Sequence, residues 1–220
     1  MRSLVIAPHP DDEVLGVGGT LLRRKSEGGE LAWLIVTGIS LQTGWAAEKV
    51  HQRENEIHEI AQLFMFDEVY NLALPAARLD QIPIVDLIKR ISDVINSFQP
   101  DEIFLPHPSD VHSDHRVVYG AAVSCTKWFR HPSVKRVLAY ETLSETDFGL
   151  TPGVIFKPNF FVNIEAHLEE KLRAMKIYGS ELGMLPFPRS LDAIRALATI
   201  RGATVGFKAA EAFELLRESI

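Results

Sequence analysis

The sequence has one cysteine, no long apolar run and no excess of positive charge. A single thiol, Cys125, among 220 residues excludes an internal disulfide bond and a metal site built from several thiolates. No stretch approaches the roughly 20 apolar residues of a membrane span, and the apolar run before Pro8 is too short for a signal segment. The formal net charge of −6 argues against nucleic acid or an anionic membrane as the main partner. We therefore expect a cytoplasmic protein that acts on a small molecule.

A glycine-rich dinucleotide-binding motif is also missing. Gly16, Gly18 and Gly19 lie inside a helical pattern that begins at Val14, whereas the dinucleotide fingerprint needs its glycines before and at the start of the helix. Close packing of this helix against a sheet explains these glycines better. Cys125 lies in another apolar helical stretch, where we expect it to be buried without a function of its own.

Apolar runs alternate with helical patterns along the first two thirds of the chain. The runs predict strands at residues 4–7, 31–37, 69–72, 102–105 and 134–140. The patterns between them predict helices at residues 14–25, 47–64, 83–99 and 117–129. Such alternation is typical of an α/β fold with a mostly parallel, Rossmann-like doubly wound sheet and helices on both faces.

The last third of the chain has a looser pattern. It predicts a strand at residues 160–164 and helices at residues 166–178, 190–201 and 208–218. No repeat, low-complexity tract or linker interrupts the sequence. With 46% hydrophobic residues, the chain has enough apolar material for one core, so we expect residues 1–220 to form a single domain.

A first cluster of polar residues follows the first expected strand. His9 and Asp12 are three positions apart, so they can point the same way in a turn that leads into a helix, while Asp11 points to one side and is free to act as a base. An aspartate pair before a helix is most often an N-cap, and this cluster alone would not outweigh that interpretation.

A second cluster follows the fourth expected strand. Residues 107–115 contain three histidines and two aspartates: His107, Asp110, His112, Asp114 and His115. In the commonest doubly wound sheet the strand order is 3-2-1-4-5, and ligands bind in the crevice at the carboxyl ends of strands 1 and 4. The two clusters are therefore expected to meet there.

The joint site would contain His9, Asp12 and one or both of His112 and His115, with Asp11 beside them. Two histidines and a carboxylate suit a catalytic Zn²⁺ ion with an open position for water. The same set also suits non-haem iron. A structural zinc site is a weaker interpretation, because such sites usually have four ligands and are rich in thiolates.

The two clusters resemble the signature motifs of the PIG-L/LmbE-like zinc-dependent N-deacetylases. The first is HPDDE at residues 9–13, and the second is HPSDVHSDHR at residues 107–116. The resemblance runs over nearly the whole chain. Its other landmarks are Arg53 with Glu56, Lys171 with Tyr178 and Ser180, and Arg201-Gly202 before residues 210–213.

This resemblance implies the roles of the site residues. It makes His9, Asp12 and His115 the zinc ligands and Asp11 the general base. His112 becomes the second catalytic group, which stabilises the oxyanion and protonates the leaving amine, and Asp114 orients it. Arg53 is placed at the substrate pocket.

The implied substrate is an N-acetylglucosamine-type sugar or sugar conjugate, and relatives often assemble as trimers or hexamers. Many relatives carry an acidic residue after the Leu-Pro that corresponds to residues 74–75, where this chain has Ala76 and Ala77, so the exact sugar stays open. Trp45 is a candidate for stacking on a sugar ring, although a packing role is equally compatible with its position. The alternatives are an amidase acting on a non-sugar N-acyl substrate, an iron-dependent oxygenase with the same three ligands, and a sugar-binding protein whose metal grips hydroxyl groups.

Overall fold

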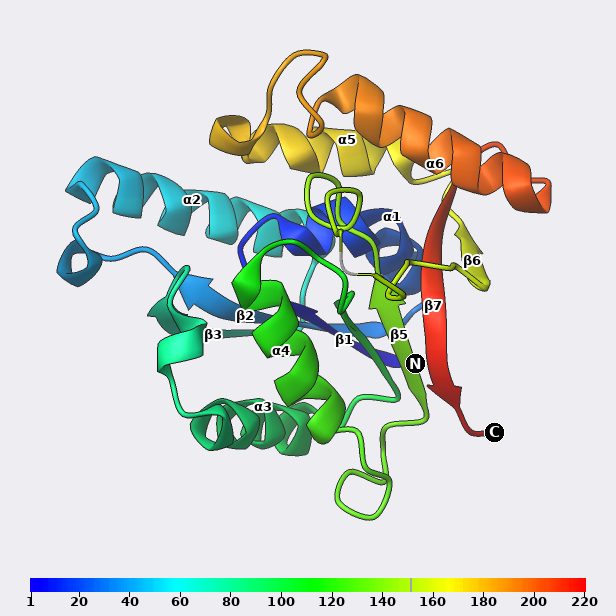
Figure 1. The fold of residues 1–220 in the computed structure, drawn as a ribbon. Helices are drawn as coiled ribbons and strands as arrows, with labels where there is room; N and C mark the ends of the chain where they lie inside the picture. Colours follow the sequence, from blue (N-terminus) through cyan, green and yellow to red (C-terminus); the bar gives the residue numbers. More distant parts are fainter. Residues whose placement is uncertain (151) are drawn as a thin grey trace.

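The computed structural model describes residues 1–150 and 152–220 and shows a mixed sheet covered by helices on both faces (Figure 1). Within the described residues the strands form one seven-stranded sheet of order β3-β2-β1-β4-β5-β7-β6. The strands are β1 (Arg2–Ala7), β2 (Glu30–Gly38), β3 (Glu68–Pro75), β4 (Glu102–Pro106), β5 (Arg136–Tyr140), β6 (Phe160–Asn163) and β7 (Ala210–Glu218). The first five are parallel, and β7 runs antiparallel to both β5 and β6. The predicted α/β class and the predicted order of the first five strands are confirmed.

The helices form two layers, each with its own apolar core. One face of the sheet is covered by α1 (Asp12–Ser26), α2 (Ala47–Phe64), α5 (Leu168–Ile177) and α6 (Leu191–Val205), and the other by α3 (Ile84–Phe98) and α4 (Ser113–Ser124) (Figure 1). Short 3₁₀ helices occur at Leu41–Thr43, Leu79–Gln81 and Gly179–Glu181. In β1, Val5 and Ala7 face the first core while Leu4 and Ile6 face the second, which explains the continuous apolar run. In the described part of the chain, no helix combines the length and apolarity needed to cross a membrane.

The predicted helix at residues 208–218 is wrong, because this segment forms strand β7. Its alanine, glutamate and leucine content favours a helix locally. In the folded chain, however, β7 pairs with β5 on one side and β6 on the other, and its Phe213 is completely buried. Hydrogen bonds to two neighbouring strands outweigh a preference of a few tenths of a kcal/mol per residue.

The fourth predicted helix is displaced toward the N-terminus, to Ser113–Ser124. The ring Nδ1 of His112 accepts a hydrogen bond of 3.1 Å from the backbone N–H of Asp114, so a histidine caps this helix. Histidine is not among the preferred N-cap residues, which explains why the sequence pattern missed the start. The consequence is that Asp114 and His115 lie in the first turn of α4.

Helix α1 packs closely on the sheet, as predicted for its glycines. A Cβ atom at Gly16 would lie 2.3 Å from a ring carbon of Tyr140 on β5, and one at Gly19 would lie 2.7 Å from Ile164. Both distances are too short for any larger residue. Glycine at these positions therefore lets α1 pack closely against β5 and against the residue that follows β6.

A buried ion pair also joins α1 to the end of the chain. Lys171 Nζ on α5 lies 2.6 Å from Glu211 Oε1 on β7, with both side chains about 5% exposed or less. Lys171 also donates to the carbonyl of Leu15, and Glu211 accepts from the backbone N–H groups of Gly19 and Thr20. The pair thus links α5, β7 and α1.

We expect Lys171→Met to lower the free energy of unfolding by roughly 3–5 kcal/mol, because it would leave the charge of Glu211 buried without its partner. Urea unfolding followed by circular dichroism measures this. The double variant with Glu211→Gln should recover part of the loss, since the unpaired charge is then removed. A loss below about 1 kcal/mol in the single variant would show that the pair contributes no more than a surface contact.

Cys125 is buried at the end of α4, as predicted, and its thiol donates to the carbonyl of Ile88 at 3.3 Å. Burial raises the pKa of this thiol to about 11. Only the thiolate is nucleophilic, so at pH 8, below this pKa, we expect alkylation by iodoacetamide to be slower by at least about 10²-fold in the folded protein than in urea. Mass spectrometry of timed samples gives the two rates. Equal rates would contradict burial of the thiol.

Candidate metal centre

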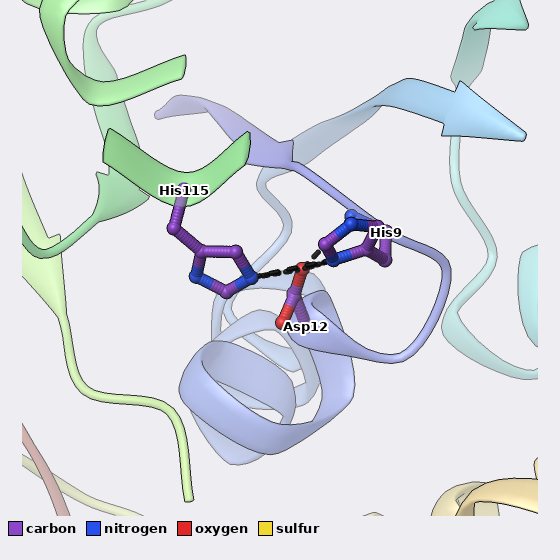
Figure 2. Close-up of side chains that lie close together, drawn as sticks. All are labelled: His9, Asp12 and His115. Carbon is purple, nitrogen blue, oxygen red and sulfur yellow. Dashed lines mark hydrogen bonds and ion pairs between the residues drawn. The ribbon is translucent and has the colours of Figure 1, made fainter. Parts of the chain in front are cut away.

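His9, Asp12 and His115 converge at the carboxyl ends of β1 and β4 (Figure 2). His9 lies in the loop after β1, Asp12 begins α1, and His115 lies in the first turn of α4. Asp12 Oδ2 lies 3.4 Å from His9 Nδ1 and 3.3 Å from His115 Nε2, and the two nitrogens are 3.3 Å apart. Residues more than a hundred positions apart thus present three donor atoms to one point.

These distances fit a tetrahedral metal ion. Ligand bonds of about 2.0–2.2 Å around a tetrahedral Zn²⁺ place the donor atoms roughly 3.3–3.6 Å from one another. Asp12 and His115 are almost completely buried, and the side chain of His9 is 22% exposed on the cavity side. The set offers three donors and leaves a fourth position open, which is the arrangement of a catalytic site.

Each histidine of this set has a carboxylate behind its second ring nitrogen. His115 Nδ1 lies 2.8 Å from Asp110 Oδ2, and Thr146 donates to the other oxygen of Asp110 at 2.7 Å. His9 Nε2 lies 3.2 Å from Asp114 Oδ2. Carboxylates in these positions hold a metal-binding imidazole in one tautomer and one orientation. The sequence interpretation missed this role of Asp110, although it belongs to the same cluster.

Asp114 is placed differently from the prediction that it orients His112. Its Oδ2 atom is 4.0 Å from His112 Nδ1, farther than from His9. The carboxylate is fixed by the backbone N–H groups of Ala77 at 2.7 Å and Leu79 at 3.3 Å. The contact to His112 comes instead from the backbone N–H of Asp114. Asp114 therefore reaches both histidines, one through its side chain and the other through its main chain.

The charges within the set are strongly coupled. Burial by itself lowers the pKa of His9, but hydrogen bonds to Asp114 and Asp12 raise it to about 9. Burial likewise opposes ionisation of Asp12, yet the positive charge of His115 brings the pKa of that carboxyl well below its usual range. The pKa of His115 is raised as well, so the buried carboxylates favour the protonated form of both imidazoles. Since a cation must displace these protons, metal binding should release them.

The side chain of Asp11 makes no capping hydrogen bond to α1, although Asp11 occupies the N-cap position. Its backbone has φ 133° and ψ −28°, a region that is costly for a residue other than glycine. The carboxylate is buried and lies 3.4 Å from Arg189 Nη1. Burial, together with the negative charges of Asp12 and Glu181, raises the pKa of Asp11 to about 8. The side chain is thus kept out of the helix cap and in the site.

Glu13 stabilises the unusual backbone conformation of Asp11. One carboxylate oxygen accepts the backbone N–H of Asp11 at 3.1 Å, and the other accepts the hydroxyl of Tyr178 at 2.8 Å. Glu13 is completely buried, and burial raises its pKa to about 8. Glu13 had no assigned function in the sequence interpretation, and Tyr178 was one of the residues that resembled family landmarks.

His112 lies at the edge of the same site, with its side chain 32% exposed. Burial and the nearby charge of His9 lower its pKa. Because Nδ1 accepts the backbone N–H of Asp114, the neutral ring carries its proton on Nε2. The backbone N–H of His112 donates to Glu145 Oε2 at 3.1 Å. The sequence interpretation expected residues 144–157 to shape substrate entry, but it gave Glu145 no role of its own.

A family model described as "PIG-L: GlcNAc-PI de-N-acetylase" matches residues 4–126, which is more than half of the chain and includes both clusters. The chain belongs to the PIG-L family. The family model is named for a de-N-acetylase, and two curated relatives that match the chain are described as deacetylases, so this PIG-L protein is an N-deacetylase, a hydrolase.

Three relatives extend this likeness beyond the matched segment. Diacetylchitobiose deacetylase of Thermococcus kodakarensis is 26% identical over 230 residues, which cover 96% of this chain and 81% of that protein. The crystal structure of the conserved protein TT1542 from Thermus thermophilus has a TM-score of 0.79 and 28% identity, with 99% of this chain and 96% of that chain covered. N,N'-diacetylchitobiose deacetylase from Pyrococcus horikoshii shares the fold, with a TM-score of 0.78, 23% identity and coverage of 98% and 84%.

The candidate metal centre of this PIG-L protein opens into a cavity of about 420 Å³. Trp45 lines the cavity and is 49% exposed, so it is available to a ligand. Ala76 and Ala77 form part of the wall. The cavity is therefore polar at the candidate metal centre and also presents an aromatic side chain in its wall.

Arg53 lines the cavity, where the resemblance placed it, but its donors are already engaged. It donates to the carbonyl of Pro10 at 2.7 Å, pairs with Glu56 at 3.0 Å and hydrogen-bonds to Glu181. Arg189 contacts Glu181 from the other side at 3.5 Å. In this PIG-L protein, Arg53 thus holds the loop that carries the first cluster.

Proposed function

We propose that this protein removes the N-acetyl group from an N-acetylglucosamine-type sugar or sugar conjugate, with Zn²⁺ held by His9, Asp12 and His115. The observation that carries the proposal is the near-equilateral set of three donor atoms, 3.3–3.4 Å apart. Beside it lies the carboxylate of Asp11, which makes no capping hydrogen bond to α1. A zinc ion bound there supplies polarisation of the amide carbonyl and a lowered pKa of the attacking water.

Asp11 acts as the general base. Its carboxylate accepts the proton that the water loses as it attacks the carbonyl carbon. Arg189 lies 3.4 Å from Asp11 Oδ2, and its positive charge favours the ionised form that a base needs. The strained backbone of Asp11 is the cost of presenting this carboxylate to the site.

His112 serves the carbonyl oxygen and the leaving amine. Its Nε2–H donor can stabilise the negative charge that develops on that oxygen. The proton that Asp11 took from the water is passed through this ring to the leaving nitrogen, so that the C–N bond can break. Asp114 holds the ring through its backbone N–H on Nδ1. Cleavage of the C–N bond gives the two products, acetate and the free amine.

The sugar part of the substrate binds in the cavity. Trp45 offers a face for stacking, as aromatic side chains commonly do for apolar ring faces. The substrate named for the Thermococcus relative, diacetylchitobiose, is an N-acetylated sugar and supports this class. We assign Arg53 to substrate positioning through the loop at Pro10.

Residues 1–220 are proposed to form a single domain, supported by a sheet in which β7, at the end of the chain, pairs with β5, a neighbour of β4. Trimeric or hexameric assembly and a cytoplasmic location stay predictions.

The decisive experiment offers a panel of N-acetylated sugars to metal-free protein reloaded with Zn²⁺, and follows free amine and acetate. Equal amounts of the two products from an N-acetylglucosamine conjugate are expected. The panel includes N-acetylated amino acids, because turnover of these alone would assign an amidase of non-sugar substrates. Reloading with Fe²⁺ under oxygen tests the oxygenase with the same ligands. Oxygen uptake without acetate release would overturn the proposal, and binding without turnover would favour a sugar-binding protein.

A further inference from the structure

Glu145 differs from the other carboxylates that line the substrate cavity, because it forms no ion pair within the described part of the chain. Asp12 belongs to the candidate metal centre. The remaining cavity carboxylates each contact Arg53 or Arg189 within 3.5 Å, and they are those of Asp11, Glu56 and Glu181. A carboxylate in a cavity without a cationic partner still needs hydrogen-bond donors, and a ligand can supply them.

Only one oxygen of Glu145 is engaged. Oε2 accepts the backbone N–H of His112 at 3.1 Å, whereas Oε1 accepts no hydrogen bond from any residue that the structure describes. The side chain is half-buried, and burial raises the pKa of Glu145, as expected where no cation balances its charge. Oε1 is therefore an acceptor without a donor in the wall of the cavity.

The chain holds Glu145 firmly in place beside the candidate metal centre. Glu145 lies in the turn after β5, and its carbonyl accepts the backbone N–H of Val111 at 3.1 Å. Thr146, the next residue, donates to Asp110 at 2.7 Å. Ser144, the residue before it, has φ 71°, which is costly for a residue other than glycine and persists only where neighbouring contacts fix it. Glu145 is thus preorganised, as specific recognition of a ligand requires.

We propose that Glu145 Oε1 accepts a hydrogen bond from a hydroxyl group of the substrate's sugar ring, which makes Glu145 a specificity-determining residue. The inference rests on the proposed function, from which it takes the sugar class and the role of His112. The leaving nitrogen that His112 serves is bonded directly to the sugar ring. Since Glu145 is hydrogen-bonded to the backbone of His112, its second oxygen lies on the side of the cavity where the ring must be.

A sugar hydroxyl suits this acceptor better than other substituents do. A hydrogen bond to an ionised carboxylate is about twice as strong as one between neutral groups. An apolar substituent in the same place would take Glu145 out of water without giving it a donor, and an anionic one would meet its negative charge. Trp45 lines the same cavity and offers a surface to the apolar face of the ring. The two residues together thus match the apolar face and the polar edge of a sugar.

The first test replaces Glu145 by glutamine, which has nearly the same shape and whose amide oxygen can still accept the N–H of His112. The substrate is the methyl glycoside of N-acetylglucosamine. We expect KM to rise roughly tenfold while kcat changes by less than about twofold, because the hydrogen bond is present in the ground state and in the transition state alike. The zinc content should not change. A fall in kcat without a rise in KM would show that Glu145 only positions His112, and it would overturn the inference.

The second test removes the sugar hydroxyls one at a time. The methyl glycoside of glucosamine, the deacetylated product, has hydroxyls on carbons 3, 4 and 6, and its monodeoxy analogues cover all of them. Calorimetry on the zinc-loaded full chain measures binding without turnover. One analogue should bind to the wild type roughly 10–100-fold more weakly than the parent glycoside, which corresponds to a hydrogen bond to a charged group. The same deletion should cost Glu145→Gln at least about fivefold less, because the charged partner is already absent. Equal losses in wild type and variant at every position would overturn the inference.

Asp147→Asn is the matched control. Asp147 lies two residues farther along the same turn, is exposed and is not among the residues that line this cavity. This variant should bind every analogue as the wild type does. If it reproduces the losses of Glu145→Gln, the effect comes from a disturbed turn and the inference is wrong. Acetate release by the wild type together with equal losses at every position would end the inference and leave the proposed function intact. A wild type that neither binds nor deacetylates these sugars would overturn both.

Discussion

Replacement of His9 by alanine is expected to abolish metal binding and activity together. The variant loses one of three donors, and Asp12 and His115 alone cannot hold an ion with comparable affinity. Without the metal the reaction loses carbonyl polarisation and water activation, which together contribute several kcal/mol and thus on the order of 10³-fold or more in rate. Metal content by mass spectrometry and acetate release on the same preparation measure the two losses.

His58→Ala is the matched control for this prediction. His58 is an exposed histidine on α2 that contacts Gln62, so its loss should change neither metal content nor rate. Thermal unfolding of metal-free wild type and metal-free His9→Ala separates loss of the ligand from loss of the fold. Full zinc occupancy in His9→Ala would show that the metal binds elsewhere, and the proposed centre would then be wrong.

Asp11→Asn should retain the metal but lose roughly 10²–10⁴-fold in kcat, the usual contribution of a general base. Asparagine has nearly the same size and tolerates positive φ better than most residues, so it fits the backbone at φ 133°. It cannot accept the proton from water. A change confined to kcat, with unchanged zinc content, is therefore expected.

The neighbouring carboxylate provides the comparison for Asp11. Asp12→Asn removes a predicted ligand one residue away, so it should lose zinc as well as rate. Both variants should therefore lose activity, but only Asp12→Asn should also lose its zinc. Near-normal turnover of Asp11→Asn with full zinc occupancy would remove Asp11 from the mechanism.

The difference between these two aspartates has a structural cause. Asp12 begins α1 and points its Oδ2 atom at the two histidines, whereas Asp11 is held by Glu13 in a conformation that turns its side chain toward Arg189. The sequence interpretation assigned the two roles by spacing and resemblance. The contact with Arg189 could not be predicted, because Arg189 lies 178 residues away.

The prediction of the C-terminal helix shows the same limit. Residues 208–218 have a composition that favours a helix, and no local signal reveals that β5 and β6 leave a place between them for a strand. Phe213 and Glu211 are buried only because β7 fills that place. Cys125 and the glycines of α1 were predicted correctly, since close packing and burial are already visible in a residue's size and in the apolar pattern around it.

The sequence by itself determined the five parallel strands, the two polar clusters and the types of side chain that reach the crevice. These depend on short-range periodicity and on the order of the elements, which a single chain displays directly. Only the tertiary structure decided that Asp110 and Asp114 support the two histidines, that Asp11 leaves the helix cap, and that the last segment is a strand. Each of these depends on distances of a few ångströms between residues far apart in the chain, and such distances exist only once the sheet brings its loops together.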